Sequence, residues 1–317
     1  MLLAALTSTD VLDIWNRVPP VPQVLICGAL TLAALFALYL LLRPAFPKVM
    51  AIARTTAKEG WAHPLFWVEL ALGAMLLVLF VYLPYNTFGE DVKMLKDSGL
   101  KLITLLSIGL AVWAASVTIA DELEGRTALT LLSKPIGRRQ FVVGKFLGVL
   151  APAFTMFVVL GTLFLATVSY KLVYDSRETS NPVPSESERR TEVVQVMPGL
   201  VLAFFETAVL ASIAIAISTR WPMLPNLMTC FAIYVLGHLT PLLVQSSIGK
   251  QVPLVTFVGR LLATLLPALD YFSSDAAIAA DVPIPLEYIG AAGLYSAIYI
   301  TIAMLAALLM FEDRDLA

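Results

Sequence analysis

The chain has 317 residues, of which 59% are apolar and only 14% are charged, and its formal net charge is −2. Soluble domains carry roughly 45–50% apolar and about 25% charged residues, so the composition excludes a soluble or disordered protein and indicates a lipid-embedded one. The net charge excludes a broad basic surface for nucleic acid. The two cysteines, Cys27 and Cys230, lie in apolar runs and form neither a disulfide framework nor a metal motif.

Apolar runs long enough to cross a bilayer recur along the chain. A membrane helix needs about 20 mostly apolar residues. The runs that meet this length are 21–42, 65–85, 102–120, 146–170, 198–219, 221–249 and 288–311. A shorter run at 252–269 contains Arg260 and is bounded by prolines, so we interpret it as a half-inserted or interfacial helix. The sequence therefore predicts an all-α, polytopic membrane protein with seven spanning helices.

Residues 1–42 form an N-terminal segment whose apolar run does not resemble a cleaved signal peptide. Acidic Asp10 and Asp13 precede the run, and no small-residue cleavage pattern follows it. We therefore expect a retained membrane anchor.

Residues 43–64 have the spacing of an amphipathic helix. The apolar positions are Phe46, Val49, Met50, Ala53, Ala57 and Trp61. The opposite face carries Lys48, Arg54, Thr55, Lys58 and Glu59. This pattern favours a helix lying in the cytoplasmic membrane interface over an ordinary connector.

Two polar segments separate the later runs. Residues 171–197 hold nine charged residues together with Pro182 and Pro184, and we interpret them as a flexible outside loop. Residues 121–145 are different, because an apolar piece between charged flanks is broken by Pro135 and Gly137. An apolar patch with a polar rim is typical of a surface that binds a partner.

The order of residues in 121–145 resembles the permease subunits of ABC type-2, export-type transporters. That family's stretch has an acidic pair, Gly, a small polar residue, Leu-Leu-Ser, Pro, Arg and then Gly-Lys at the next span. The positions that fit are Glu122, Glu124, Gly125, Thr127, Leu131, Leu132, Ser133, Pro135, Arg138, Gly144 and Lys145. The C-terminal tail is similar to the family's Phe-x-x-Arg-Asp-Leu ending, with Phe311, Arg314, Asp315 and Leu316.

The resemblance covers 43–317 and implies an elbow helix at 43–64 and a six-helix permease core at 65–317, with 21–42 as one extra N-terminal transmembrane helix. It also implies that 121–145 contains a coupling helix that docks on a separate ABC ATPase. In that arrangement Asp121, Glu122 and Glu124 lie at the N-terminal end of the coupling helix, where the helix dipole favours anions. Leu131 and Leu132 supply apolar contact, and Arg138 pairs with acids or lipid headgroups. The implied partners are the ATPase, a second permease chain of the same or a different kind, and membrane lipid.

Three polar residues within the apolar runs are candidates for a translocation path. Glu206 lies deepest, whereas Glu69 is close enough to its helix end to reach the interface. A neutral or helix-bonded carboxyl is an equal alternative for Glu206, and His238 is more typical of a helix–helix hydrogen bond. The sequence leaves two other functions open: a proton-coupled secondary transporter that uses Glu206, and a non-transporting scaffold whose 121–145 segment recruits a soluble partner.

The chain is not expected to hydrolyse ATP itself or to hold a cofactor. A phosphate-binding loop requires G-x-x-x-x-G-K-[ST], and the nearest match, between Gly137 and Lys145, has the wrong spacing and is followed by Phe146. With two histidines and no H-E-x-x-H, no metal or catalytic site is predicted. The segments 43–64, 121–145, the turn near Arg220 and the C-terminal tail together hold 11 Lys/Arg against 7 Asp/Glu, whereas the other side holds 10 against 14. This basic bias indicates a cell-membrane protein with a cytoplasmic C-terminus and an outside N-terminus. If 252–269 spans the membrane fully, the C-terminus lies outside instead.

Overall fold

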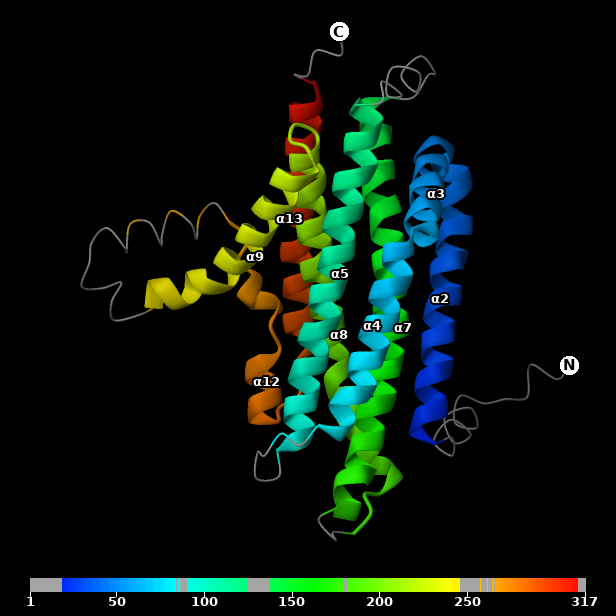
Figure 1. Cartoon of the computed structure of the whole chain (residues 1–317), viewed down its shortest axis with the longest axis vertical. Helices are drawn as coiled ribbons and strands as arrows, with labels where there is room; N and C mark the ends of the chain where they lie inside the picture. Colours follow the sequence, from blue (N-terminus) through cyan, green and yellow to red (C-terminus); the bar gives the residue numbers. More distant parts are fainter. Residues whose placement is uncertain are drawn as a thin grey trace, which may run out of the picture.

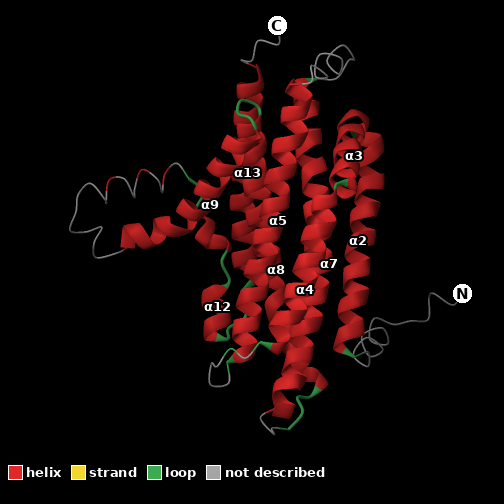
Figure 2. Ribbon diagram, in the orientation of Figure 1, coloured by secondary structure: helices red, strands yellow, loops and turns green. Residues whose placement is uncertain are grey.

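The computed structural model describes residues 19–83, 85, 90–124, 137–178, 182–245, 257, 261, 264 and 266–312. Every regular element in these residues is helical, which confirms the predicted all-α class. The helices are α2 (Pro20–Ala45), α3 (Pro47–Ala62), α4 (Pro64–Tyr82), α5 (Asp91–Glu124), α7 (Arg138–Glu178), α8 (Glu186–Ser218), α9 (Met223–Gln245), η1 (Leu269–Phe272), α12 (Asp275–Ala280) and α13 (Leu286–Glu312). Figures 1 and 2 show the long helices side by side in an upright bundle, with α9 leaving it at a steep angle.

Six helices in the described part of the chain are long and apolar enough to cross a membrane: α2, α4, α5, α7, α8 and α13. They contain six of the seven predicted spans and confirm a multi-pass membrane protein. The seventh, 221–249, corresponds to α9, whose described apolar part Met223–Leu239 is shorter than a full crossing. Most of the predicted half-inserted helix at 252–269 lies outside the described residues.

The prediction of an irregular loop at 171–197 is wrong, because α7 and α8 extend through most of that segment. The start of α8 is set by a capping box. The Ser185 hydroxyl accepts a hydrogen bond from the Glu188 backbone N–H, and the Glu188 carboxylate accepts one from the Ser185 N–H at 2.9 Å. This reciprocal pair satisfies two backbone donors that a helix start otherwise leaves unpaired.

Ion pairs between helices stabilise these polar extensions. Lys96 of α5 pairs with Glu192 of α8, and only 5% of the lysine side chain is exposed. Lys171 of α7 lies 2.9 Å from Asp175 and 3.8 Å from Asp91 of α5. A nearly buried charge requires a partner of this kind. The charges that suggested a solvated loop therefore hold the ends of the helices together.

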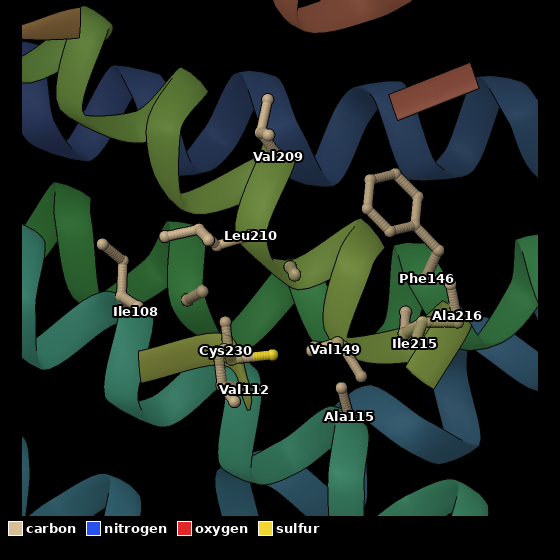
Figure 3. Close-up of a cluster of buried hydrophobic side chains, with 14 of the residues drawn as sticks. Ile108, Val112, Ala115, Phe146, Val149, Val209, Leu210, Ile215, Ala216 and Cys230 are labelled. Carbon is tan, nitrogen blue, oxygen red and sulfur yellow. The ribbon is translucent and has the colours of Figure 1, made fainter. Parts of the chain in front are cut away.

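One core cluster of the bundle is built from apolar side chains of α5, α7, α8, α9, η1 and α13, many of them alanine or branched residues. Figure 3 shows this packing, in which side chains of α5, α7, α8 and α9 meet. The residues labelled there are Ile108, Val112, Ala115, Phe146, Val149, Val209, Leu210, Ile215, Ala216 and Cys230. Small side chains allow transmembrane helices to approach closely, which is how such helices gain packing energy in lipid.

The structure bears out part of the apolar face predicted for 43–64 and identifies what that part contacts, whereas Phe46 and Trp61, predicted for the same face, are exposed. Met50, Ala53 and Ala57 of α3 are buried, whereas Arg54 and Lys58 on the opposite face are exposed. The buried face packs along the beginning of α7. This face therefore contacts α7, and the interfacial position of the helix stays a prediction.

Two glycines of α7 permit the close approach of α3. A Cβ atom added to Gly148 would lie 2.5 Å from Cβ of Thr56 and 2.9 Å from the carbonyl oxygen of Ala53. A Cβ atom added to Gly144 would lie 2.8 Å from Cβ of Ile52. These contacts involve backbone or Cβ atoms that cannot rotate away, so any larger residue must push the two helices apart.

We expect Gly148→Ala to destabilise the protein by about 1–3 kcal/mol, the usual cost of overpacking a close contact. Gly290→Ala is the matched control, because a Cβ atom there meets nothing within 4 Å. The control should be neutral or stabilising by up to about 1 kcal/mol, since alanine favours helix. The difference in stability is measured by thermal unfolding of both variants in detergent. Unfolding is monitored through the reaction of a thiol-specific dye with the buried Cys230 as it becomes exposed. Equal midpoints for the two variants would show that α3 does not depend on this contact.

Candidate functional site

One end of the bundle gathers the segments that the charge distribution predicted to share a side of the membrane. Figure 1 shows the α2–α3 junction, the end of α5, the start of α7, the α8–α9 turn and the end of α13 together at the top. Two contacts join them: Arg220 Nε donates to the Met310 carbonyl at 2.9 Å, and the rings of Phe141 and Phe311 stack at 5.6 Å. The predicted grouping of these segments agrees with the fold.

The segment predicted to dock a partner lies between α5 and α7. Its residues Gly125, Thr127, Leu131, Leu132, Ser133 and Pro135 are outside the described residues, and Arg138 is the exposed first residue of α7. Asp121, Glu122 and Glu124 belong to the last turn of α5, whereas the resemblance placed them at the start of the coupling helix. The reason is that no glycine or proline interrupts the chain between Gly109 and Gly125, so α5 continues through the acids.

A buried lysine joins the two helices from which this segment emerges. Lys145 of α7 is only 2% exposed, and its Nζ donates to the Thr118 carbonyl of α5 at 3.3 Å. The same Nζ lies 5.8 Å from the ring centroid of Phe141, a distance typical of a cation–π contact. This contact joins the two helices from which the 125–136 segment emerges.

A polar pocket of about 350 Å³ lies among α5, α8, α9 and the η1–α12 region. Glu206 of α8 is only 4% exposed, and its Oε1 lies 3.6 Å from Nε2 of His238 on α9. That distance suits an ion pair when the imidazole is protonated but is too long for a hydrogen bond. The other imidazole nitrogen, Nδ1, is 3.0 Å from the Tyr234 carbonyl oxygen, which orients the ring.

Charged groups from three helices line the same pocket. Lys101 of α5 lies 3.1 Å from Asp275 of α12 and 2.8 Å from Asp97 of its own helix. Asp270 of η1 adds another carboxylate to the lining. Ionisable groups within transmembrane bundles face the interior or an aqueous cavity and are typical of substrate or ion pathways. The pocket can accept a polar or charged group and surround it with both signs of charge.

Comparison with known families identifies the chain. The family model described as ABC-2 family transporter protein matches residues 48–316. The chain belongs to this family. No curated protein matches it.

Membership makes this ABC-2 permease a transmembrane component of an ABC transporter, distinct from the ATPase with which the family generally works. The match begins within α3 and includes all later helices, so the predicted family resemblance is confirmed over residues 48–316. Helix α2 lies outside the matched range, and its interpretation as an addition to the core stays a prediction.

The permease brings together two of the three polar residues predicted for a translocation path. Glu206 and His238 face each other in the pocket, but Glu69 does not line it. Glu69 lies on α4 against α5, with Oε1 3.7 Å from the position of a Cβ on Gly109.

Sequence reasoning missed the other charged groups of the pocket. Lys101 stands directly before the charge-free run 102–120, and Asp275 follows a short polar stretch, so both read as residues at the ends of apolar runs. A charge at the very edge of an apolar run was the available signal.

Proposed function

We propose that this permease is the transmembrane subunit of an ATP-driven exporter and couples to a separate ATPase through residues 121–145. Membership of the ABC-2 family supports the proposal, because its permeases generally work with such a partner. The hydrogen bond between Lys145 of α7 and Thr118 of α5 also supports the proposal, because it joins the helices on the two sides of the segment. A docked ATPase that moves the segment would move α5 and α7 together. Export follows from the resemblance of the segment to export-type members.

The proposed assembly contains two permease chains, alike or different, in the cell membrane. The end of the bundle that holds the 121–145 segment, the α8–α9 turn and the C-terminal end of α13 is proposed to face the cytoplasm, with the N-terminus outside. Together with residues 43–64, these segments hold 11 Lys/Arg against 7 Asp/Glu, which supports this orientation. ATP is available only on the cytoplasmic side, so a segment that docks an ATPase must face the cytoplasm.

The pocket between Glu206 and Lys101 is proposed to lie on the translocation path. Its position among α5, α8 and α9 connects it to the helix that carries one end of the docking segment, because α5 contributes both Lys101 and Thr118. A movement of α5 driven at the docking segment therefore changes the pocket.

The Glu206–His238 pair also supports a second candidate, a secondary transporter in which the carboxyl carries a proton. Purification of the tagged permease from its native membrane distinguishes the two. The exporter predicts that an ATP-binding-cassette ATPase co-purifies and that proteoliposomes transport only with ATP. Flux driven by a pH gradient in the absence of ATP supports the second candidate instead, and absence of any flux supports the scaffold.

A further inference from the structure

A groove of about 680 Å³ separates the C-terminal part of α2 from α3. Its lining includes three cations, Arg43 of α2 and Arg54 and Lys58 of α3, and no acidic residue. Within the described residues none of the three forms an ion pair. All three side chains are exposed, so the groove presents positive charge that the rest of the described chain does not neutralise.

The groove lies at the boundary between lipid and water. On α2, Arg43 directly follows the charge-free run 21–42. On α3, Thr56 stands between Arg54 and Lys58 and packs against Gly148 of α7. That glycine lies near the start of the charge-free run 146–170. Two independent helices thus place the cations where apolar spans end, which is the depth of lipid headgroups.

The walls of the groove suit the upper part of a lipid molecule. Tyr39, Met50 and Pro44 line it beside the cations. Leu38 and Leu41 of α2 are 50% and 73% exposed, so the helix next to the groove faces the acyl chains. Tyrosine is typical of the headgroup level, where its ring is in apolar surroundings and its hydroxyl in polar ones.

We propose that this groove binds the headgroup of an anionic phospholipid. The lipid phosphate would lie among Arg43, Arg54 and Lys58. A guanidinium group donates two parallel hydrogen bonds to phosphate oxygens, and basic residues near a membrane attract anionic lipid. Helix α2 lies outside the range matched by the family, so the site includes residues that the family match does not cover. Bound lipid would join α2 to α3.

Native mass spectrometry of the purified chain tests the proposal. The protein is incubated with equal amounts of phosphatidylglycerol and phosphatidylcholine of the same acyl chains, and the retained lipids are counted. We expect preferential retention of phosphatidylglycerol by the wild type. The variant R54A/K58A should retain about a hundredfold less, because each direct hydrogen bond from a cation to the phosphate contributes about tenfold, or roughly 1.4 kcal/mol. Circular dichroism checks that the variant is folded, and Arg43→Ala tests the site from α2 if it is not.

The control is K48A/R139A, which removes two cations at the same end of the bundle but from residues that do not line this groove. It should retain phosphatidylglycerol within about twofold of the wild type. Equal losses in both double variants would mean that only diffuse charge attracts the lipid, and unchanged retention by R54A/K58A would place the lipid elsewhere. Displacement of the lipid by excess inorganic phosphate would identify a free phosphate site; each of these results overturns the proposal.

Discussion

Changing Leu131 and Leu132 together to aspartate is expected to release the ATPase from the permease while membrane insertion stays intact. Burial of each leucine in a partner's groove contributes about 1.5–3 kcal/mol, so the loss of both lowers affinity more than a hundredfold. Co-purification of the ATPase with the tagged permease from solubilised membranes measures the effect. The charge-reversal variant E122K/E124K should weaken the same complex, because both acids lie in the last turn of α5 beside the docking segment.

The control for the leucine pair adds the same two charges at the other end of the bundle. Val183 and Val282 are 65% and 57% exposed and lie in connections before α8 and α13. V183D/V282D should therefore insert and bind the ATPase like the wild type. If the permease carrying Leu131→Asp and Leu132→Asp still retains the ATPase at wild-type level, the 121–145 segment is not the docking site.

The spans were predictable because each helix in lipid must be apolar over its crossing length. Six of the seven predicted runs correspond to long apolar helices in the structure. The ends were not predictable, since α7 and α8 continue into polar sequence that resembles a loop. What stabilises those ends is pairing across helices, such as Lys96 with Glu192, and pairing depends on which helices are neighbours. A single sequence does not contain that information.

The same limit applies to the candidate site. The apolar and polar faces of α3 followed from helical spacing, but the partner of the apolar face, α7, did not. Glu206 and His238 were each recognisable as polar residues in apolar runs, although 31 positions in the chain separate them. Their meeting at 3.6 Å depends on how α8 and α9 pack. By contrast, Glu69 has the same sequence signature and lies outside the pocket, so the signature alone does not identify the pocket.

Glu206→Gln is expected to slow transport roughly tenfold to a hundredfold without weakening assembly. Glutamine keeps the size of the side chain and removes the carboxyl group that faces His238, which corresponds to a loss of about 1.4–3 kcal/mol of interaction. The folded protein should be as stable as the wild type or more stable, because a buried carboxylate is costly and Glu206 Oε1 has no hydrogen-bond partner among the described residues. Slower transport together with unchanged stability separates a functional role from a structural one.

Flux is measured in proteoliposomes containing permease and ATPase, with the compound that most stimulates ATP hydrolysis by the complex. Glu69→Gln is the matched control, since it makes the same change in a carboxylate outside the pocket, and it should transport at the wild-type rate. His238→Gln should slow transport as much as Glu206→Gln, and the double variant should be no slower than either, because all three remove the same pair. Transport at the wild-type rate by Glu206→Gln would show that the Glu206–His238 pair has only a structural role. Additive losses in the double variant would show that the two residues act separately.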